Sequence, residues 1–334
     1  MRSTTILTAM VALGGLLAAS SPAMAGPSGY TFTTIVVPGS LPGTTGGFAL
    51  GLNDWGQIVG DFTDNAGTHG FLDTGGKFTA INPPGDTFTL LNGINNLGQI
   101  LGSSSSIGSF LYAHGTFTPL SNLGGSAFAF GVNDLGQIVG GGVGSNGSLG
   151  FLFTRGRITT YAAPGASVTA GYGINDFGQI VGNYLDSTGF HPFLDTRGVF
   201  TNIEVPGEFP LATGINNLGQ ITGDFCDDEG CHGFLDTKGN FTTIDVPDAS
   251  FTDPEGINDL GQIVGVFADS TGLFSAFVAT PIHGFARSAL TTSAIDPPAD
   301  AVPEPSTWVM LLLGFTGLGF AGYRATQKSL STTA

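Results

Sequence analysis

The two cysteines are the most reactive side chains of the sequence, and their spacing predicts what they do. Cys226 and Cys231 flank an acidic turn, residues 227–230, and hold the positions that Thr63 and Thr68 occupy in an equivalent segment. Two strands joined by that turn would place the sulfurs opposite each other, where a disulfide forms in an oxidising compartment. Zinc or redox chemistry is the weaker alternative, because two thiols without further ligands make a poor metal site.

Three histidines recur at equivalent positions, and histidine is a common metal ligand and proton carrier. His69, His191 and His232 each lie two residues before a phenylalanine. A ring of ligands is one interpretation. We favour the simpler one, a side chain that packs at the start of a strand, because equivalent positions of a repeated fold lie far apart.

Acidic turns also recur, around Asp64, Asp186, Asp227 and Asp269. Calcium needs six to eight oxygen ligands, and one such turn offers about three. Ordinary turn chemistry, with Asp at the first position and Gly at the fourth, explains these residues more simply. We therefore expect no cofactor and no metal site, and calcium at these turns is the alternative.

The sequence contains no nucleophile elbow, no zincin motif and no P-loop. A G-x-G-x-x-G pattern at residues 142–147 is not followed by a helical segment, so it does not predict a nucleotide site. Glu204, Glu208, Asp245 and Glu255 could pair in space as the two acids of a glycosidase. We expect no catalytic residue. The alternative is a secreted polysaccharide hydrolase or lyase, in which several repeated units of the fold (blades) each supply carboxylates.

The charge of the chain argues against one class of partner. Of 334 residues, 25 are acidic and 9 are basic, which gives a net charge of −16. Binding of nucleic acid requires clustered Lys and Arg, so we expect no nucleic-acid partner. Gly accounts for 55 residues and charged side chains for only 10%. Together with abundant Thr, Ile, Val and Phe, this composition favours strands and tight turns.

The chain is organised by a ten-residue phrase that occurs six times. Its consensus is Gly-Ile-Asn-Asp-Leu-Gly-Gln-Ile-Val-Gly, and its copies begin at Gly51, Gly93, Gly131, Gly173, Gly214 and Gly256. Successive copies are 42, 38, 42, 41 and 42 residues apart. A period near 40 residues, with four short segments of strand character in each copy, is typical of a propeller blade.

The fourth segment of each repeat, of the form Phe-Thr-x-Ile, indicates a closed ring. It is missing from the sixth repeat, after Phe277, and a copy stands instead at the N-terminal end, in residues 32–37. An N-terminal strand that completes the last blade would close the circle and remove exposed sheet edges. We therefore predict an all-β fold, a six-bladed β-propeller over residues 26–280. An open β-solenoid is the alternative.

Both ends of the chain differ from the repeats. Residues 1–25 have the layout of a secretory signal peptide, with a positive start, an apolar stretch and an A-x-A cleavage site at residues 23–25. Residues 281–301 carry no repeat and are expected to be a flexible linker. The apolar run 308–323 predicts a transmembrane helix, and the basic residues Arg324 and Lys328 place its C-terminal end in the cytoplasm.

Residues 302–334 resemble the PEP-CTERM sorting signal of Gram-negative bacteria. Pro303, Glu304 and Pro305 form the motif, and the apolar run and basic end follow in the family's order. The resemblance implies recognition by an exosortase-type sorting enzyme. It also implies a secreted protein at the cell surface or in the extracellular matrix, anchored transiently or permanently in the inner membrane through residues 308–323.

The repeats resemble the HAF family of bacterial extracellular repeats, through the ten-residue phrase and through tripeptides such as His69-Gly-Phe71 and Ser275-Ala-Phe277. That family implies no assigned activity. We expect a non-enzymatic binding or structural module. An extracellular glycan is the expected partner class, by analogy with the anchor.

Overall fold

The computed structural model describes residues 24–25, 29–40, 47–123, 127–144 and 148–282. They belong to one compact unit, residues 1–285. Most of residues 1–25, nearly all of the linker 281–301, and the whole of 302–334 with Pro303, Glu304 and Pro305 lie outside the described residues. The same is true of the predicted transmembrane helix 308–323. In the part of the chain that is described, no helix is long and apolar enough to cross a membrane.

Four repeats form separate four-stranded antiparallel sheets in which sequence neighbours pair. Their strands are β3 (Phe48–Leu52), β4 (Gln57–Asp64), β5 (Gly67–Thr74), β6 (Lys77–Ala80); β7 (Thr89–Ile94), β8 (Ile100–Ser104), β9 (Gly108–Ala113), β10 (Thr116–Pro119); β11 (Phe128–Val132), β12 (Ile138–Val143), β13 (Leu149–Thr154), β14 (Arg157–Tyr161); and β15 (Val168–Ile174), β16 (Gln179–Asp186), β17 (Gly189–Thr196), β18 (Val199–Asn202). A 3₁₀ turn, η1, covers Ser121–Leu123.

The remaining strands form one nine-stranded sheet, where the sequence predicts two four-stranded blades. They are β1 (Met24–Ala25), β2 (Tyr30–Ile35), β19 (Glu208–Ile215), β20 (Gln220–Asp227), β21 (Gly230–Thr237), β22 (Asn240–Ile244), β23 (Phe251–Ile257), β24 (Ile263–Ala268) and β25 (Phe274–Pro281). One parallel pair, Cys231 with Phe251, joins β19–β22 to the other strands. All other pairings in this sheet are antiparallel.

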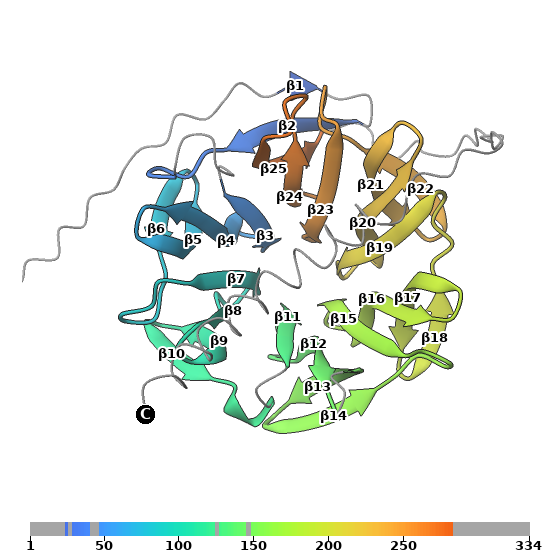
Figure 1. The fold of residues 1–334 in the computed structure, drawn as a ribbon, viewed down its shortest axis with the longest axis horizontal. Helices are drawn as coiled ribbons and strands as arrows, with labels where there is room; N and C mark the ends of the chain where they lie inside the picture. The colour runs from blue at the N-terminus through green and yellow to red at the C-terminus, as the bar shows by residue number, and fades with distance from the viewer. Residues whose placement is uncertain (1–23, 26–28, 41–46, 124–126, 145–147, 283–334) are drawn as a thin grey trace, which may run out of the picture. The chain divides into compact units, whose positions relative to one another are not determined.

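The sheets stand around a central axis (Figure 1), and the first strand of each repeat is innermost. These inner strands are β3, β7, β11, β15, β19 and β23. The first glycine of the phrase permits this crowding, because a Cβ added to Gly51 would lie 2.8 Å from the Cα of Gly93. Antiparallel sheets arranged around an axis in this way make a β-propeller.

The N-terminal strand joins the end of the repeat region, as the sequence predicts. β2 pairs antiparallel with β25 from Tyr30↔Pro281 to Ile35↔Ala276. The observed strand is displaced from the predicted 32–37, because β25 extends to Pro281 and Pro38 cannot donate a ladder hydrogen bond. β1 adds two pairs to β2, Met24↔Phe32 and Ala25↔Thr31. Cleavage of the signal peptide after Ala25 would remove β1.

The core is repeated like the strands. The largest fully buried side chains are the phenylalanines of the third strand, Phe71, Phe110, Phe151, Phe193, Phe234 and Phe277. Each hydrophobic cluster includes residues of neighbouring repeats: Val59 of β4, for example, packs with Leu91 and Ile94 of β7. Each sheet therefore buries its apolar surface against its neighbour, so that neighbouring repeats stabilise each other.

The predicted disulfide is present. Cys226 of β20 and Cys231 of β21 face each other across the hairpin and are bonded. In the first repeat the same two positions hold Thr63 and Thr68, whose hydroxyls lie 3.1 Å apart.

Replacing both cysteines by threonine, Cys226→Thr with Cys231→Thr, should lower the free energy of unfolding by about 2 kcal/mol, because the loop that the bond closes is short. The variant copies the hydroxyl pair of the first repeat, so its hairpin should still form. Urea denaturation measures the difference. A variant as stable as the disulfide-bonded protein would contradict this estimate.

Candidate functional site

Each inner strand ends in the same Asn-Asp/Asn-x-Gly turn, and side-chain chemistry explains its shape. In the first repeat, Oδ1 of Asn53 accepts hydrogen bonds from the N–H groups of Trp55 (3.1 Å) and Gln57 (3.0 Å). Asn side chains favour such turns because they hydrogen-bond to their own backbone. Gly56 has φ of 71°, which glycine adopts at no steric cost. The turn points the next residue, Asp54, toward the axis.

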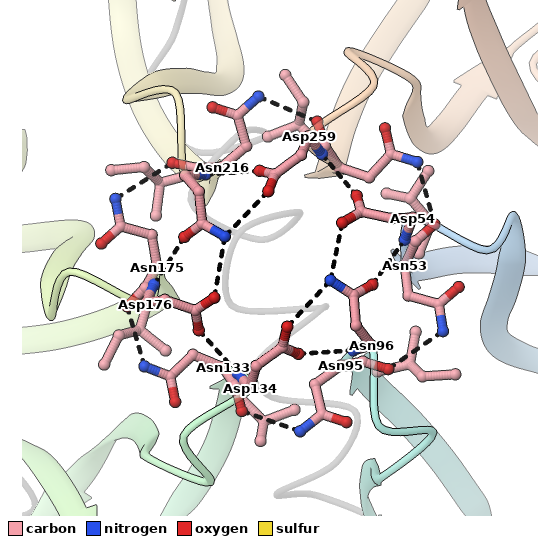
Figure 2. Close-up of a pocket in the computed structure, with 18 residues that line it drawn as sticks. Asn53, Asp54, Asn95, Asn96, Asn133, Asp134, Asn175, Asp176, Asn216 and Asp259 are labelled. Atoms are coloured by element: carbon pink, nitrogen blue, oxygen red, sulfur yellow. Dashed lines mark hydrogen bonds between the residues drawn. The ribbon is translucent and has the colours of Figure 1, made fainter.

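The first Asn of each turn also binds the neighbouring repeat. Nδ2 of Asn53 donates to the carbonyl of Asn95 at 3.1 Å. The same bond joins every successive pair of repeats, at 2.9–3.2 Å. The last of them closes the circle, because Nδ2 of Asn258 donates to the carbonyl of Asn53 at 3.0 Å, across 205 residues of sequence. Figure 2 shows these bonds around the axis.

The second residue of each turn forms another closed circle. The N–H of Asp54 donates to Oδ1 of Asn96 at 2.8 Å, and each following residue repeats this bond to the next turn. The N–H of Asp259 completes it by donating to Oδ1 of Asp54 at 2.8 Å. We call the six side chains Asp54, Asn96, Asp134, Asp176, Asn217 and Asp259 the axial ring (Figure 2).

Two asparagines of the axial ring bridge its four aspartates. Nδ2 of Asn96 donates to Oδ2 of both Asp54 (2.8 Å) and Asp134 (3.0 Å). Nδ2 of Asn217 does the same to Asp176 and Asp259, at 3.0 Å each. Both oxygens of every aspartate therefore accept N–H donors. This pattern suits ionised carboxylates, which only accept hydrogen bonds.

The axial ring lines a small pocket at the mouth of the ring, with a volume of about 80 Å³. The eighteen lining residues, all within the described ranges, come in equal number from the six repeats and include no Lys, Arg or His. Four carboxylates therefore face this pocket without a basic partner in its wall. Its field attracts positive groups and repels negative ones.

Removing one amide of the first circle tests how much it stabilises the fold. Asn258→Ala leaves the buried carbonyl of Asn53 and the N–H groups of Leu260 and Gln262 without their side-chain partner. We expect a loss of roughly 2–4 kcal/mol in the free energy of unfolding, measured by urea denaturation. The control is Asn240→Ala, whose amide makes an exposed bond to Thr237. Equal losses in both variants would contradict this role.

The carboxylates of the axial ring do not resemble the separated acid pair of a glycosidase. Nδ2 of Asn96 donates to Oδ2 of both Asp54 and Asp134, so these two oxygens lie no more than about 6 Å apart. The amide of Asn96 occupies the space between them, where a substrate bond would have to enter. The arrangement holds the ring together.

A second group of axial side chains follows a β-bulge that the sequence analysis missed. Every inner strand shifts register just before the first glycine of the phrase. Bulges re-aim side chains and are frequent beside functional sites. The bulged residues differ in all six repeats: Leu50, Asn92, Phe130, Tyr172, Thr213 and Glu255. In the sequence, the bulge corresponds to a residue that differs between the six repeats and directly precedes the first glycine of the phrase, which all six share.

Contacts link these bulged residues across repeats. The rings of Phe130 and Tyr172 lie 4.8 Å apart, and Nδ2 of Asn92 donates to the carbonyl of Ala129 at 2.8 Å. Burial raises the pKa of Tyr172 to about 12, and the charge of Glu255 adds to the shift. Of the four acids that could have paired as catalytic groups, only Glu255 is axial. Glu204 and Glu208 are exposed, and Asp245 binds His232.

Acids are buried around Glu255, and no basic side chain of the described residues forms an ion pair with them. Burial raises the pKa of Asp61 and of Asp253 to about 7. It also raises the pKa of Asp224 and Glu255, and the charge of Asp253 contributes to both shifts. Among the described residues, Oδ1 of Asp224 and Oδ1 of Asp253 are buried without a hydrogen-bond partner. Burial therefore shifts all four carboxyls toward their neutral form.

The surroundings of Asp224 explain why its Oδ1 has no hydrogen-bond partner. The equivalent residue in the fourth repeat is Asn183, whose Oδ1 accepts the N–H of Ala212 in the next repeat at 3.1 Å. Asp224 belongs to the fifth repeat, and in the sixth repeat the residue that corresponds to Ala212 is Pro254, which has no N–H. Asp224 therefore lacks the donor that its position offers elsewhere.

The histidines do not converge. Nε2 of His69, His191 and His232 contacts Asp64, Asp186 and Asp227 respectively, each in the hairpin of the same repeat, at 3.1–3.2 Å. The acidic turns mostly use their oxygens locally, as Oδ1 of Asp64 does when it accepts the N–H of Ala66. The described residues contain no group of three or more His, Cys, Asp or Glu arranged to hold a metal ion.

The residue between the axial ring and the turn glycine is apolar and exposed in every repeat. These six side chains are Trp55, Leu97, Leu135, Phe177, Leu218 and Leu260, and each is 60–75% exposed. They belong to the same turns as the axial ring, so they surround the pocket. We call them the apolar crown. Large exposed apolar groups gathered on one face mark interaction sites.

The chain is similar to several solved structures. TolB from Acinetobacter baumannii matches with a TM-score of 0.50 and 11% identity, over 67% of this chain and 63% of TolB. The chain thus spans less than two thirds of TolB. The Aleuria aurantia lectin in complex with Fucα1-6GlcNAc gives a TM-score of 0.44 and 14% identity, over 72% and 98% of the two chains. The propeller domain of the Pyrococcus furiosus Trilobed protease gives 0.40 and 7%, over 71% and 81%.

No curated protein matches the chain. The PEP-CTERM protein-sorting motif matches residues 301–325, in agreement with the predicted sorting signal. That motif points to export and to a cell-surface or extracellular location in bacteria. The chain thus joins an all-β propeller to a C-terminal PEP-CTERM protein-sorting motif.

Proposed function

We propose that this protein is a surface-displayed propeller that binds an extracellular polysaccharide and performs no catalysis. The observation that carries the proposal is the apolar crown around the axial ring. It combines exposed side chains for contact with a polar pocket whose groups are already bonded to one another. A binding face needs such a rigid, preorganised surface.

The C-terminal signal supplies the location. Its motif supports recognition by an exosortase-type system, and residues 308–323 would hold the chain in the inner membrane before or after sorting. The single disulfide, Cys226–Cys231, suits an oxidising compartment. The resemblance of the repeats to the HAF family stays a prediction and adds no activity.

The ring in this proposal has six blades. Six inner strands, six equivalent turns and two closed circles of hydrogen bonds support that count. Only one parallel pair joins β21 to β23. We therefore interpret the nine-stranded sheet as two neighbouring blades in contact, the second completed by β2.

The experiment uses the chain from residue 26 onward, purified in detergent and incubated with the polysaccharide of its host. Retention of the protein on the polymer, with no increase in reducing ends, is the expected result. Release of reducing ends would favour the alternative, a polysaccharide hydrolase. A rise in ultraviolet absorbance from unsaturated products would favour a lyase. Absence of retention would refute the binding role.

A further inference from the structure

The side chains of the axial ring and the apolar crown follow an approximate twofold pattern around the pocket. Each turn contributes one axial-ring residue and one crown residue. In ring order these pairs are Asp54-Trp55, Asn96-Leu97, Asp134-Leu135, Asp176-Phe177, Asn217-Leu218 and Asp259-Leu260. The first and fourth pairs carry the aromatic side chains, so Trp55 and Phe177 lie on opposite sides of the pocket.

A hydrogen bond to the next repeat anchors the ring of Trp55. Its Nε1 donates to the carbonyl of Asn96 in the next repeat at 2.9 Å, although the side chain is 75% exposed. A ring held in place before binding loses little entropy when a ligand packs on it. Trp is also the residue type most often decisive at binding surfaces.

Charge limits what can cover the crown. Four aspartates of the axial ring point into the pocket, and its wall has no Lys, Arg or His. An acidic polymer would be repelled. A second copy stacked on the same face would bring eight carboxylates together, so self-association through this face is disfavoured. A partner that presents a positive group at the centre and apolar surface at the edge fits both features.

The size of the pocket limits which part of that partner enters. A volume of about 80 Å³ accommodates an ammonium group with water, since a cavity of about 10–15 Å³ is enough for one water. The bulk of the ligand must therefore lie across the crown. The C–H faces of sugar rings pack on aromatic side chains, and Trp55 and Phe177 offer two such platforms with the carboxylates between them.

We propose that the apolar crown is the docking surface for a polysaccharide that carries free amino groups. Its sugar rings pack on Trp55 and Phe177, and an ammonium group lies over the axial ring. This inference rests on the proposed function and specifies the polymer. It also requires binding to weaken with salt, because exposed ionic attraction is screened.

The test compares the chain from residue 26 onward with the double variant Trp55→Ala/Phe177→Ala, by calorimetric titration with glucosamine oligomers. We expect binding to weaken at least about tenfold in the variant. Phe190→Ala is the matched control, because Phe190 is an exposed aromatic residue of β17 outside the crown. It should bind like the wild type. Circular dichroism and thermal melting establish that each variant is folded.

Other probes separate the possible failures. Equal binding of fully N-acetylated oligomers, or equally tight and crown-dependent binding of polylysine, would overturn the inference. So would a folded double variant with unchanged affinity. If both the wild type and the double variant retained host polysaccharide, the proposed binding of polysaccharide would stand. The claim that the apolar crown is its docking surface would be refuted. Binding of glucosamine oligomers without retention of host polysaccharide would refute the proposed function alone.

Discussion

Replacing Phe32 by alanine should lower the free energy of unfolding by about 3–5 kcal/mol, the usual cost of removing a buried phenylalanine. Phe32 is 3% exposed, packs on Phe277 with ring centres 6.0 Å apart, and belongs to a buried cluster that also contains residues of β21–β25. The loss is large because β2 is the N-terminal strand that binds β25, the last strand of the repeats.

Equilibrium urea denaturation measures this loss. Val36→Ala is the matched control, because Val36 follows β2 directly and is 46% exposed. It should change stability by less than about 0.5 kcal/mol. If Phe32→Ala and Val36→Ala were equally mild, β2 would not be a structural part of the ring.

Raising the pH from 5 to 8 should destabilise the protein, and Asp61→Asn should remove part of that effect. Burial raises the pKa of the Asp61 carboxyl from 3.8 to about 7. At pH values between these two pKa values, the Asp61 carboxyl holds a proton in the folded protein and releases it in the unfolded chain. Stability therefore falls as the pH rises through that window and levels off above it.

Asp253, Asp224 and Glu255 act in the same direction, because burial raises the pKa of each. The exposed turn acids act in the opposite direction at lower pH. Hydrogen bonds within the turn lower the pKa of Asp186 and Asp269, so their contribution is lost as the pH falls below about 4. We therefore expect maximum stability in mildly acidic solution.

The Asn variant has a natural precedent, since the fourth repeat carries Asn183 at the position of Asp61. At pH 8 we expect Asp61→Asn to be more stable than the wild type by on the order of a few kcal/mol, because each pKa unit corresponds to about 1.4 kcal/mol. Denaturation curves at pH 5, 6, 7 and 8 measure the slope. Asp228→Asn, at an exposed turn, controls for the loss of a negative charge. A wild-type protein equally stable from pH 5 to 8 would contradict the argument.

The fold was largely predictable because its signals are local and repeated. The phrase fixes the inner strand, turn and second strand by residue type alone. The likeness between residues 32–37 and Phe241–Val246 reveals the strand that joins the two ends. The disulfide followed from hairpin register, which pairs Cys226 with Cys231 directly.

The candidate site was not predictable in the same way, because it is made of bonds between repeats. Asn53 looks like a turn residue in the sequence, and its turn bonds are indeed local. Its bond to Asn95 depends on how two sheets pack, which no local pattern contains. The bulge that aims Glu255 toward the axis is likewise a property of strand pairing. The burial of Asp61 depends on the neighbouring sheet.

Hydrogen–deuterium exchange on the chain from residue 26 onward, with and without host polysaccharide, tests the binding face most directly. We predict that added protection is confined to the six turns of the apolar crown, residues 53–57, 95–99, 133–137, 175–179, 216–220 and 258–262. The outer strands β6 and β22 should exchange as before. Protection centred on those outer strands, with the six turns unchanged, would contradict the account.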